Sequence, residues 1–239
     1  MQSKKYHELL IRLLEKSNSV ILTRQELIEI IVSEKNIEEL SNENFLFQER
    51  NTPTHCLVHG CDSRDIEYEF KDNKVIVTDL QNPDHKIEDN INKWITCELN
   101  IQKIVQYLLE SIFGSIKCSN TTQIENMYAI QTTFNNSNVD IIFSLSNHIY
   151  EDELFKALGP SLIFKRPVII ISKDTEENFD EINSICLKLP LGNFVYPFYV
   201  KDFNNKETGE DLNDWINRIL EIKKMEENII KDLPKNALS

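Results

Sequence analysis

The densest group of side chains that could do chemistry lies between residues 55 and 61. Four nitrogen or sulfur donors fall within these seven residues: His55, Cys56, His59 and Cys61. Zinc sites use such donors in a tetrahedron, usually as two separated pairs that each hold the ion from one side. A single contiguous cluster wraps poorly around one ion, and no second pair follows in the chain. The four residues are candidate zinc ligands, but ordinary loop thiols and imidazoles are the favoured interpretation.

Polar side chains that follow two apolar runs form the second group of candidates. His148 comes shortly after the run 139–145, and Asp174 comes shortly after the run 167–172. Because ligands of open α/β sheets gather at the carboxyl ends of parallel strands, these side chains indicate a candidate site at that edge. A plain loop histidine is the competing interpretation of His148. If the two strands are adjacent and parallel, the neighbours of His148 are Asn147, Lys173 and Asp174.

Asp140, near the start of an apolar run, has the place that a restriction-type nuclease gives to its first metal-binding acid. Such a nuclease also needs an acid-x-lysine pair on the next strand, to hold Mg²⁺ and activate water. In this chain Lys173 precedes Asp174, which is the wrong order. A cryptic or degenerate nuclease or other hydrolase, with Asp140, His148 and Asp174 as its candidate residues, is therefore an alternative to a non-catalytic chain.

Phosphate-binding and nucleophile motifs are missing from the sequence. The five glycines, at positions 60, 114, 159, 192 and 209, match neither the dinucleotide-binding spacing nor the P-loop spacing. No Gly-x-Ser-x-Gly elbow occurs, and the cysteines lack the local signature of a catalytic cysteine. Apart from the candidate zinc ligands, the sequence predicts no cofactor, and it favours a chain that is not an enzyme.

Composition and charge narrow the classes of partner and compartment. The 239 residues include 26 Lys plus Arg against 39 Asp plus Glu, a net charge of −13. Such a chain repels a phosphate backbone, so direct binding of nucleic acid is not expected. No apolar run is long enough for a membrane span, the start lacks a signal-peptide core, and five cysteines suggest no disulfide framework. We therefore expect an acidic cytoplasmic protein with reduced thiols.

The first 80 residues resemble a winged helix in the order of their elements. Helical spacing covers 4–16, a capping box at Thr23 opens a second helix, and a third helix is expected at about 36–44. The alternation of 66–70 and 75–77 around a polar turn predicts a β-hairpin in the place of the wing. In a DNA-binding member the third helix reads bases, but here that helix is acidic. The resemblance therefore implies a protein-contacting module, with a DNA-binding regulator as the alternative.

A polar connector at 81–90 is expected to separate this module, residues 1–80, from a second domain at 91–239. Apolar runs without polar alternation predict central parallel strands that helices cover on both faces. The expected fold class is therefore mixed α/β: a winged-helix-like module followed by an open α/β sheet domain with flanking helices. Its expected elements are a helix at 91–113, a strand pair at 127–134 and 139–145, a helix at 151–158 ended by Gly159 and Pro160, a strand at 167–172, a helix at 176–187, a strand at 194–200 and a closing helix at 212–231.

The run 139–146 and the acidic helix after it resemble the opening strand and helix of Toll/interleukin-1 receptor domains. This resemblance covers about twenty residues, and it implies a hydrolase that cleaves NAD. The glutamate that such an enzyme uses has no counterpart in any motif of this chain. Because strand burial explains the same residues, the hydrolase stays an alternative.

Together these features favour a non-enzymatic protein–protein interaction or regulatory subunit of a microbial multi-subunit assembly, such as one for phage defence. The expected partner is a protein with a basic surface, because the chain itself is acidic. Candidate anchors for that partner are the aromatic side chains of 45–47 and 196–199, for which core packing is the competing interpretation. The sequence leaves the oligomeric state open.

Overall fold

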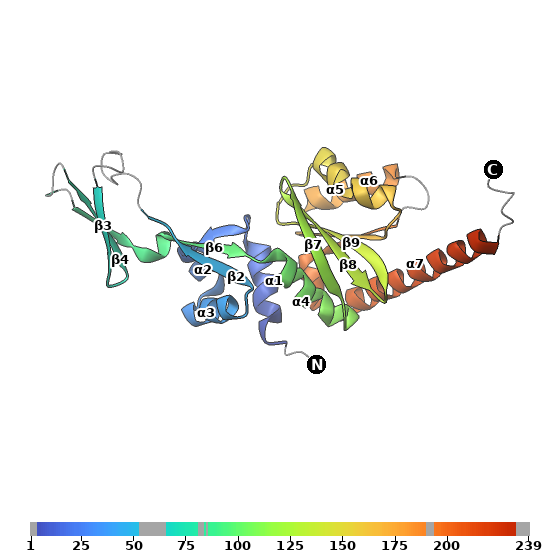
Figure 1. The fold of residues 1–239 in the computed structure, drawn as a ribbon, viewed down its shortest axis with the longest axis horizontal. Helices are drawn as coiled ribbons and strands as arrows, with labels where there is room; N and C mark the ends of the chain where they lie inside the picture. Colours follow the sequence, from blue (N-terminus) through green and yellow to red (C-terminus); the bar gives the residue numbers. More distant parts are fainter. Residues whose placement is uncertain (1–3, 53–65, 81–83, 85, 190–193, 233–239) are drawn as a thin grey trace. The chain divides into compact units, whose positions relative to one another are not determined.

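The computed structural model of the chain describes residues 4–52, 66–80, 84, 86–189 and 194–232 (Figure 1). In these ranges the chain is mixed α/β, with seven α-helices and three β-sheets. It divides into two compact units. We call Met1–Asn18 together with Ile101–Ser239 the α/β unit, and Ser19–Asn100 the inserted unit. This division differs from the expected one at 81–90, because the second half of that segment is the strand β5 (Lys86–Asn90), which pairs with β4 (Lys74–Asp79).

The α/β unit is built on a five-stranded mixed sheet. In sheet order its strands are β11 (Val195–Tyr199), β10 (Val168–Ser172), β9 (Ser137–Ser144), β8 (Met127–Phe134) and β7 (Lys117–Ile124). The strands β7, β8 and β9 form an antiparallel meander, whereas β9, β10 and β11 run parallel. The strand pair expected at 127–134 and 139–145 is confirmed as β8 and β9. The strands expected at 139–145, 167–172 and 194–200 lie side by side in one sheet, as β9, β10 and β11.

Helices cover both faces of this sheet (Figure 1). They are α1 (His7–Lys16), α4 (Ile101–Phe113), α5 (Glu151–Ile163), α6 (Glu176–Lys188) and α7 (Lys206–Asp232), with short 3-10 helices at Lys4–Tyr6 and Val200–Asn204. On one face, Leu158 of α5 and Ile182 of α6 pack with Ile170 of β10. On the other face, α4 packs against β7 and β8, and Phe113 contacts Phe134. The sheet is therefore the middle layer of three.

The central strand β10 shows why the chain folds this way. Each of its five residues is at most 1% exposed. A strand buried on both faces needs apolar side chains at successive positions, and Val168 to Ile171 supply them. The sequence prediction of a central parallel strand is confirmed here.

The inserted unit contains two three-stranded sheets and two α-helices in its described residues. In chain order its elements are β1 (Ile21–Thr23), α2 (Arg24–Ile31), α3 (Glu34–Asn42), β2 (Leu46–Arg50), β3 (Ile66–Lys71), β4 (Lys74–Asp79), β5 (Lys86–Asn90), a 3-10 helix at Ile91–Lys93 and β6 (Ile95–Leu99). The strand β6 pairs with β1 and β2, and β4 pairs with β3 and β5. The capping box predicted at Thr23 is present at the start of α2, and the predicted hairpin is β3 and β4.

The hairpin does not occupy the place of a wing after α3. The strand that follows α3 is β2, and its partner is β6, whereas β3 and β4 belong to a separate sheet with β5. The winged-helix order expected for 1–80, with its wing at 66–77, is therefore not confirmed.

The long helix expected at 91–113 is wrong in its first part. Residues 91–93 form a 3-10 helix and residues 95–99 form β6, so only Ile101–Phe113 is α-helical, as α4. The apolar residues of this segment recur at steps that suit a helix, but Ile95 and Thr96 are β-branched and favour a strand. β6 pairs with β1 on one side and with β2 on the other, and these partners satisfy the hydrogen bonds of its backbone. This pairing favours a strand over a helix at 95–99.

The helix expected to end at Gly159 and Pro160 continues to Ile163 as α5. Proline inside a helix lacks the N–H that would bond one turn back, but its own carbonyl still accepts. The Phe164 N–H donates to the Pro160 oxygen at 3.2 Å, and so completes the last turn.

Candidate ligand site at the carboxyl edge of the sheet

Three loops meet beyond the carboxyl ends of the parallel strands. The strands β9, β10 and β11 end at Ser144, Ser172 and Tyr199, and their parallel pairing brings the residues that follow them to one edge of the sheet. A pocket of about 320 Å³ lies at this edge. Its lining residues are Glu15, Asn147, Lys173, Asp174, Thr175 and Lys201. Glu15 comes from the last turn of α1, Lys201 comes from the 3-10 helix that follows β11, and the others come from the loops after β9 and β10.

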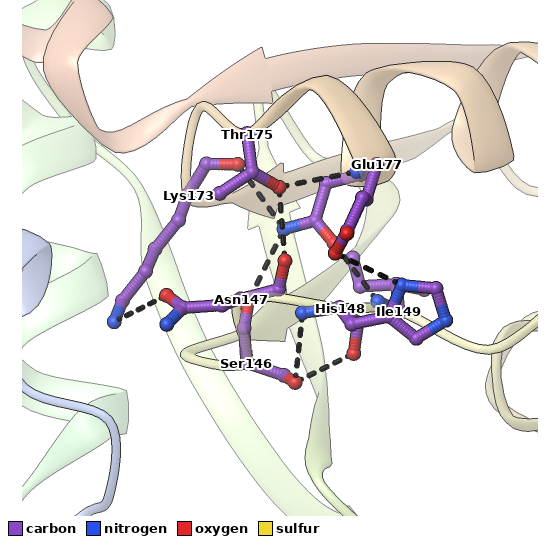
Figure 2. A network of polar contacts seen from close by, with 8 residues as sticks. Ser146, Asn147, His148, Ile149, Lys173, Thr175 and Glu177 are labelled. Carbon is purple, nitrogen blue, oxygen red and sulfur yellow. Dashed lines mark hydrogen bonds and ion pairs between the residues drawn. The ribbon is translucent and has the colours of Figure 1, made fainter.

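Asn178 of α6 holds the loops after β9 and β10 together, in the network that Figure 2 shows. Its side chain is fully buried. Its Oδ1 accepts a hydrogen bond from the backbone N–H of Ile149 at 2.8 Å, and its Nδ2 donates to the carbonyl oxygens of Ser146 at 3.1 Å and Lys173 at 3.2 Å. An amide both donates and accepts, so one side chain satisfies three buried backbone groups of the two loops.

Thr175 fastens the same two loops from the start of α6. Its Oγ1 accepts a hydrogen bond from the Asn178 N–H at 3.1 Å, which caps the helix, and it donates to the Asn147 carbonyl oxygen at 2.9 Å. Because Asn147 is tied at its backbone, its side chain is presented to the pocket from a fixed position (Figure 2).

Lys173 is the one lining residue whose charge is buried. The residue is only 5% exposed. Its Nζ donates to Oδ1 of Asn18 at 2.7 Å and to Oδ1 of Asn147 at 3.1 Å. Both partners are neutral amides, and no described carboxylate lies within ion-pair distance of this ammonium group. Burial lowers the pKa of Lys173 from its ordinary value of 10.5, and no neighbouring charge offsets that effect.

The other charged residues of the pocket lie closer to solvent. Asp174 and Lys201 form an ion pair, and the hydrogen bond from Lys201 to Asp174 raises the pKa of Lys201. Both of these side chains are about half exposed, so the pair contributes little stability. Glu15 is exposed at the end of α1. The charged lining residues are therefore one ion pair near the rim, the exposed carboxylate of Glu15, and the buried ammonium group of Lys173, which has no described carboxylate within ion-pair distance.

His148 lies beside this pocket and does not line it. Its Nδ1 is 3.3 Å from Oε2 of Glu177 (Figure 2). Its ring stands edge-on to the ring of Tyr150, with 4.4 Å between the ring centroids. The strands before His148 and Lys173 are adjacent and parallel, as expected if the loops that follow them are neighbours. Lys173 and Asp174, rather than His148, reach the pocket.

Asp140 lies at the opposite end of the sheet from His148 and Asp174. It stands beside Val168, the first residue of β10, in the register of the two strands. Its Oδ2 accepts a hydrogen bond from Oγ of Ser161 at 2.8 Å, and Nη1 of Arg166 lies 3.4 Å from its Oδ1. This buried carboxylate fastens the end of α5 and the loop before β10. The candidate residues of the hydrolase alternative therefore do not form one site.

The candidate zinc ligands His55, Cys56, His59 and Cys61 lie outside the described residues. Within the part of the chain that the structure describes, no group of three or more His, Cys, Asp or Glu side chains is placed to hold a metal ion. None of the helices in the described ranges combines the length and the apolar character that a membrane crossing requires.

The described cysteines and the tyrosine nearest the pocket are poor reactive groups. Burial raises the pKa of Cys97 to about 11 and that of Cys118 to about 12, and it also raises the pKa of Cys186. Burial, with Asp174 and Asp202 nearby, raises the pKa of Tyr199 to about 12. These groups are therefore neutral at physiological pH, and the thiols are weak nucleophiles.

Lys173 brings one buried cationic hydrogen-bond donor to the pocket, and Asn147 and Thr175 are its neutral polar walls. Sequence analysis named Asn147, Lys173 and Asp174 only as neighbours of His148, and it missed Glu15, Asn18, Asn178 and Lys201. A signal existed for Lys201, because it follows the third parallel strand almost directly. No local signal exists for Asn18, which lies 155 positions before its partner Lys173.

Comparison of the chain with protein-family models, with curated proteins and with solved structures found no match.

Proposed function

We propose that the chain is a non-enzymatic regulatory or interaction subunit whose α/β unit binds a small anionic ligand at the carboxyl edge of its sheet. The observation that carries this proposal is the ammonium group of Lys173. It is buried, it lines a pocket of about 320 Å³, and its hydrogen-bond partners are two neutral amide oxygens.

The physical argument is that a buried charge without a counter-charge is costly. Charged side chains are seldom buried unless they are paired, because their hydration is lost. An anion in the pocket would supply the missing counter-charge, and the hydrogen bond that it accepts from Lys173 would be stronger than those that the two amide oxygens accept. The position agrees with the general rule that open α/β sheets bind ligands beyond the carboxyl ends of their parallel strands.

The test is a titration with inorganic sulfate and with acetate, at constant ionic strength, followed by NMR or calorimetry. Sulfate keeps its charge over the whole working range of pH, so the protonation of the probe does not enter. Hydrogen bonds to charged groups contribute about 1.5–3 kcal/mol, so Lys173→Met should weaken the binding of one or both probes by about tenfold or more. Methionine keeps most of the length of the side chain and removes the charge.

Lys188→Met is the matched control, because Lys188 is a half-exposed lysine that pairs with Glu151 elsewhere on the unit. That variant should bind the probes as the wild type does. Equal affinities in wild type, Lys173→Met and Lys188→Met would show that Lys173 binds no anion and would overturn the proposal.

An enzyme is the second candidate, and the burial of the Lys173 amine in a pocket favours it, because burial lowers the pKa of this lysine. An amine with a lowered pKa is a better nucleophile toward a carbonyl carbon, as in Schiff-base enzymes. Incubation with glyoxylate followed by borohydride reduction, with peptide mass spectrometry, distinguishes the two. A simple anion site predicts no more adduct on Lys173 than on Lys188, whereas selective modification of Lys173 would favour the enzyme.

The inserted unit is proposed to contact protein, through a winged-helix-like arrangement of β1, α2, α3, β2 and β6. In support, two helices in succession, α2 and α3, lie between β1 and β2 in the chain, and β6 joins these two strands in a three-stranded antiparallel sheet of order β1-β6-β2. Arg24 lies 3.9 Å from both Glu34 and Glu38, so a basic side chain near α3 is occupied by carboxylates. A gel shift with random duplex DNA at low salt should therefore show no retardation, and retardation would favour the DNA-binding alternative.

Membership of a multi-subunit assembly is the setting that we propose for this subunit. The net charge of −13 favours a partner with a basic surface. Affinity purification of the tagged chain from its native cells should return a partner in constant stoichiometry. Recovery of the chain alone, at its natural concentration, would contradict this part of the proposal.

A further inference from the structure

The lysine of the pocket also holds the residue at which the chain leaves the α/β unit. Asn18 is the last residue of the first segment of that unit, and Ser19 begins the inserted unit. Nζ of Lys173 donates to Oδ1 of Asn18 at 2.7 Å, the shorter of its two hydrogen bonds. The preceding residue, Ser17, is buried, and its N–H closes the last turn of α1 on the Leu13 oxygen at 2.9 Å. The exit from α1 is therefore fastened at two successive residues.

Asn18 and a ligand of the pocket would bind the same ammonium group from different sides. Asn147 and Lys173 line the pocket, whereas Asn18 does not. An ammonium group has three N–H donors, and the described residues accept two of them. A ligand can take the third donor without displacing Asn18. Glu15, from the last turn of α1, is the pocket residue nearest to Asn18 in the chain.

We propose that anion binding in this pocket tightens the hold of Lys173 on Asn18, and that the site thereby controls the segment through which the α/β unit leads into the inserted unit. This inference rests on the proposed anion site. The physical basis is that a lysine side chain loses rotamer entropy when its ammonium group is fixed. Once one partner, Asn18 or the anion, has fixed the side chain, the other partner binds without that loss of entropy. Such coupling is reciprocal, so Asn18 must favour the anion by the same factor as the anion favours Asn18.

The size of the effect follows from the rotamer entropy of lysine. The rotamer freedom that a fully fixed lysine loses corresponds to about tenfold to thirtyfold in an equilibrium constant. Because Lys173 is already mostly buried, only part of that amount is left to be shared, and we expect a coupling of about threefold to fivefold. The other charges at the pocket, Glu15, Asp174 and Lys201, stay in place in each variant used below.

The experiment is hydrogen–deuterium exchange of the full chain, read by mass spectrometry on a peptide that covers 17–20. Sulfate near saturation is compared with chloride at the same ionic strength. In the wild type, sulfate should slow exchange in this peptide about threefold to fivefold, beyond any slowing in peptides from β3 and β4. In Asn18→Ala the response should be lost, and the affinity for sulfate should fall by the same factor. Asn18 is exposed, so this variant should fold.

Asn228→Ala is the matched control, because Asn228 is an exposed asparagine on α7. It should keep both the sulfate affinity and the exchange response of the wild type. If sulfate binds at Lys173 but exchange at 17–20 is unchanged, the coupling is overturned and the anion site stands. If sulfate does not bind, both proposals are overturned. Equal slowing in every peptide would be a general salt effect and would overturn the coupling.

Discussion

Asn178 is the residue whose replacement tests the architecture of the site most severely, and Asn178→Asp is the sharpest change. The two side chains have nearly the same shape. Asparagine accepts one hydrogen bond from Ile149 and donates two, to the carbonyl oxygens of Ser146 and Lys173. Aspartate keeps the acceptor, but it places a carboxylate oxygen where the two carbonyl oxygens need a donor. The loops after β9 and β10 would thus lose two bonds and gain a repulsion.

The magnitude follows from counting groups. Each lost hydrogen bond costs about 1 kcal/mol, and each buried polar group left without a partner costs about 1–3 kcal/mol. With two donors removed and a carboxylate placed at a fully buried position, we expect Asn178→Asp to lower the free energy of unfolding by about 3–5 kcal/mol at pH 7. That is a large part of the stability of an ordinary domain.

The pH dependence has a definite sign. Burial raises the pKa of the new carboxyl group in the folded state, so its folded form holds a proton more tightly than its unfolded form. The penalty is therefore complete above that raised pKa, and it shrinks as the pH falls through it, because the neutral carboxyl group is less costly to bury and can donate one hydrogen bond. The difference from wild type should be smaller at pH 5 than at pH 7.

The assay is urea unfolding at both pH values, with Asn228→Asp on the exposed face of α7 as the matched control. The control should change the free energy of unfolding by less than about 0.5 kcal/mol. A loss below about 1 kcal/mol in Asn178→Asp at pH 7, with an unchanged urea dependence, would refute the role that we assign to Asn178.

Three further predictions concern the rest of the unit. In urea unfolding, Asp140→Asn should lower the free energy of unfolding by about 2 kcal/mol, because Ser161 and Arg166 lose a buried anionic partner. In a sulfate titration the same variant should bind as the wild type does, and weaker binding would contradict the separation of the two sheet edges. Burial raises the pKa of Cys97 to about 11 and that of Cys118 to about 12, so both thiols should react with iodoacetamide at pH 8 far more slowly in the folded chain than in urea. Peptide mass spectrometry measures the two rates, and equal rates would show that these thiols are not buried. Because burial lowers the pKa of Lys173, the folded state binds the proton of this lysine less tightly than the unfolded state does. The free energy of unfolding of the wild type, minus that of Lys173→Met, should therefore rise with pH from the lowered pKa up to 10.5. A difference in urea unfolding that does not change with pH would contradict this.

The parts of the fold that were predictable are those in which burial alone dictates the residues. Val168 to Ile171 lie in a strand with helices on both faces, so every position is apolar and the strand is evident. The strands β5 and β7 were missed for the opposite reason. The strand β5 is polar at most positions, and β7 is the largely exposed edge of the five-stranded sheet. Their pairing partners, rather than their own side chains, make them strands.

The candidate site was predictable only in part. The rule on carboxyl ends of parallel strands led to the correct loops, and so to Asn147, Lys173 and Asp174. The sequence pointed first to His148, because it follows the strand expected at 139–145, but this side chain pairs with Glu177 beside the pocket. The importance of Lys173 comes from its burial and from Asn18, a residue brought to it only by the packing of α1.

The measurement that tests the central claim most directly is the pKa of Lys173 itself, read by NMR on lysine labelled with ¹³C at Cε, with and without sulfate. Lys173→Met identifies the signal. We expect a pKa below the ordinary value of 10.5 in the absence of the anion and a rise when sulfate is added. An ordinary pKa that sulfate does not change would contradict the account, because the buried ammonium group would then need no counter-charge.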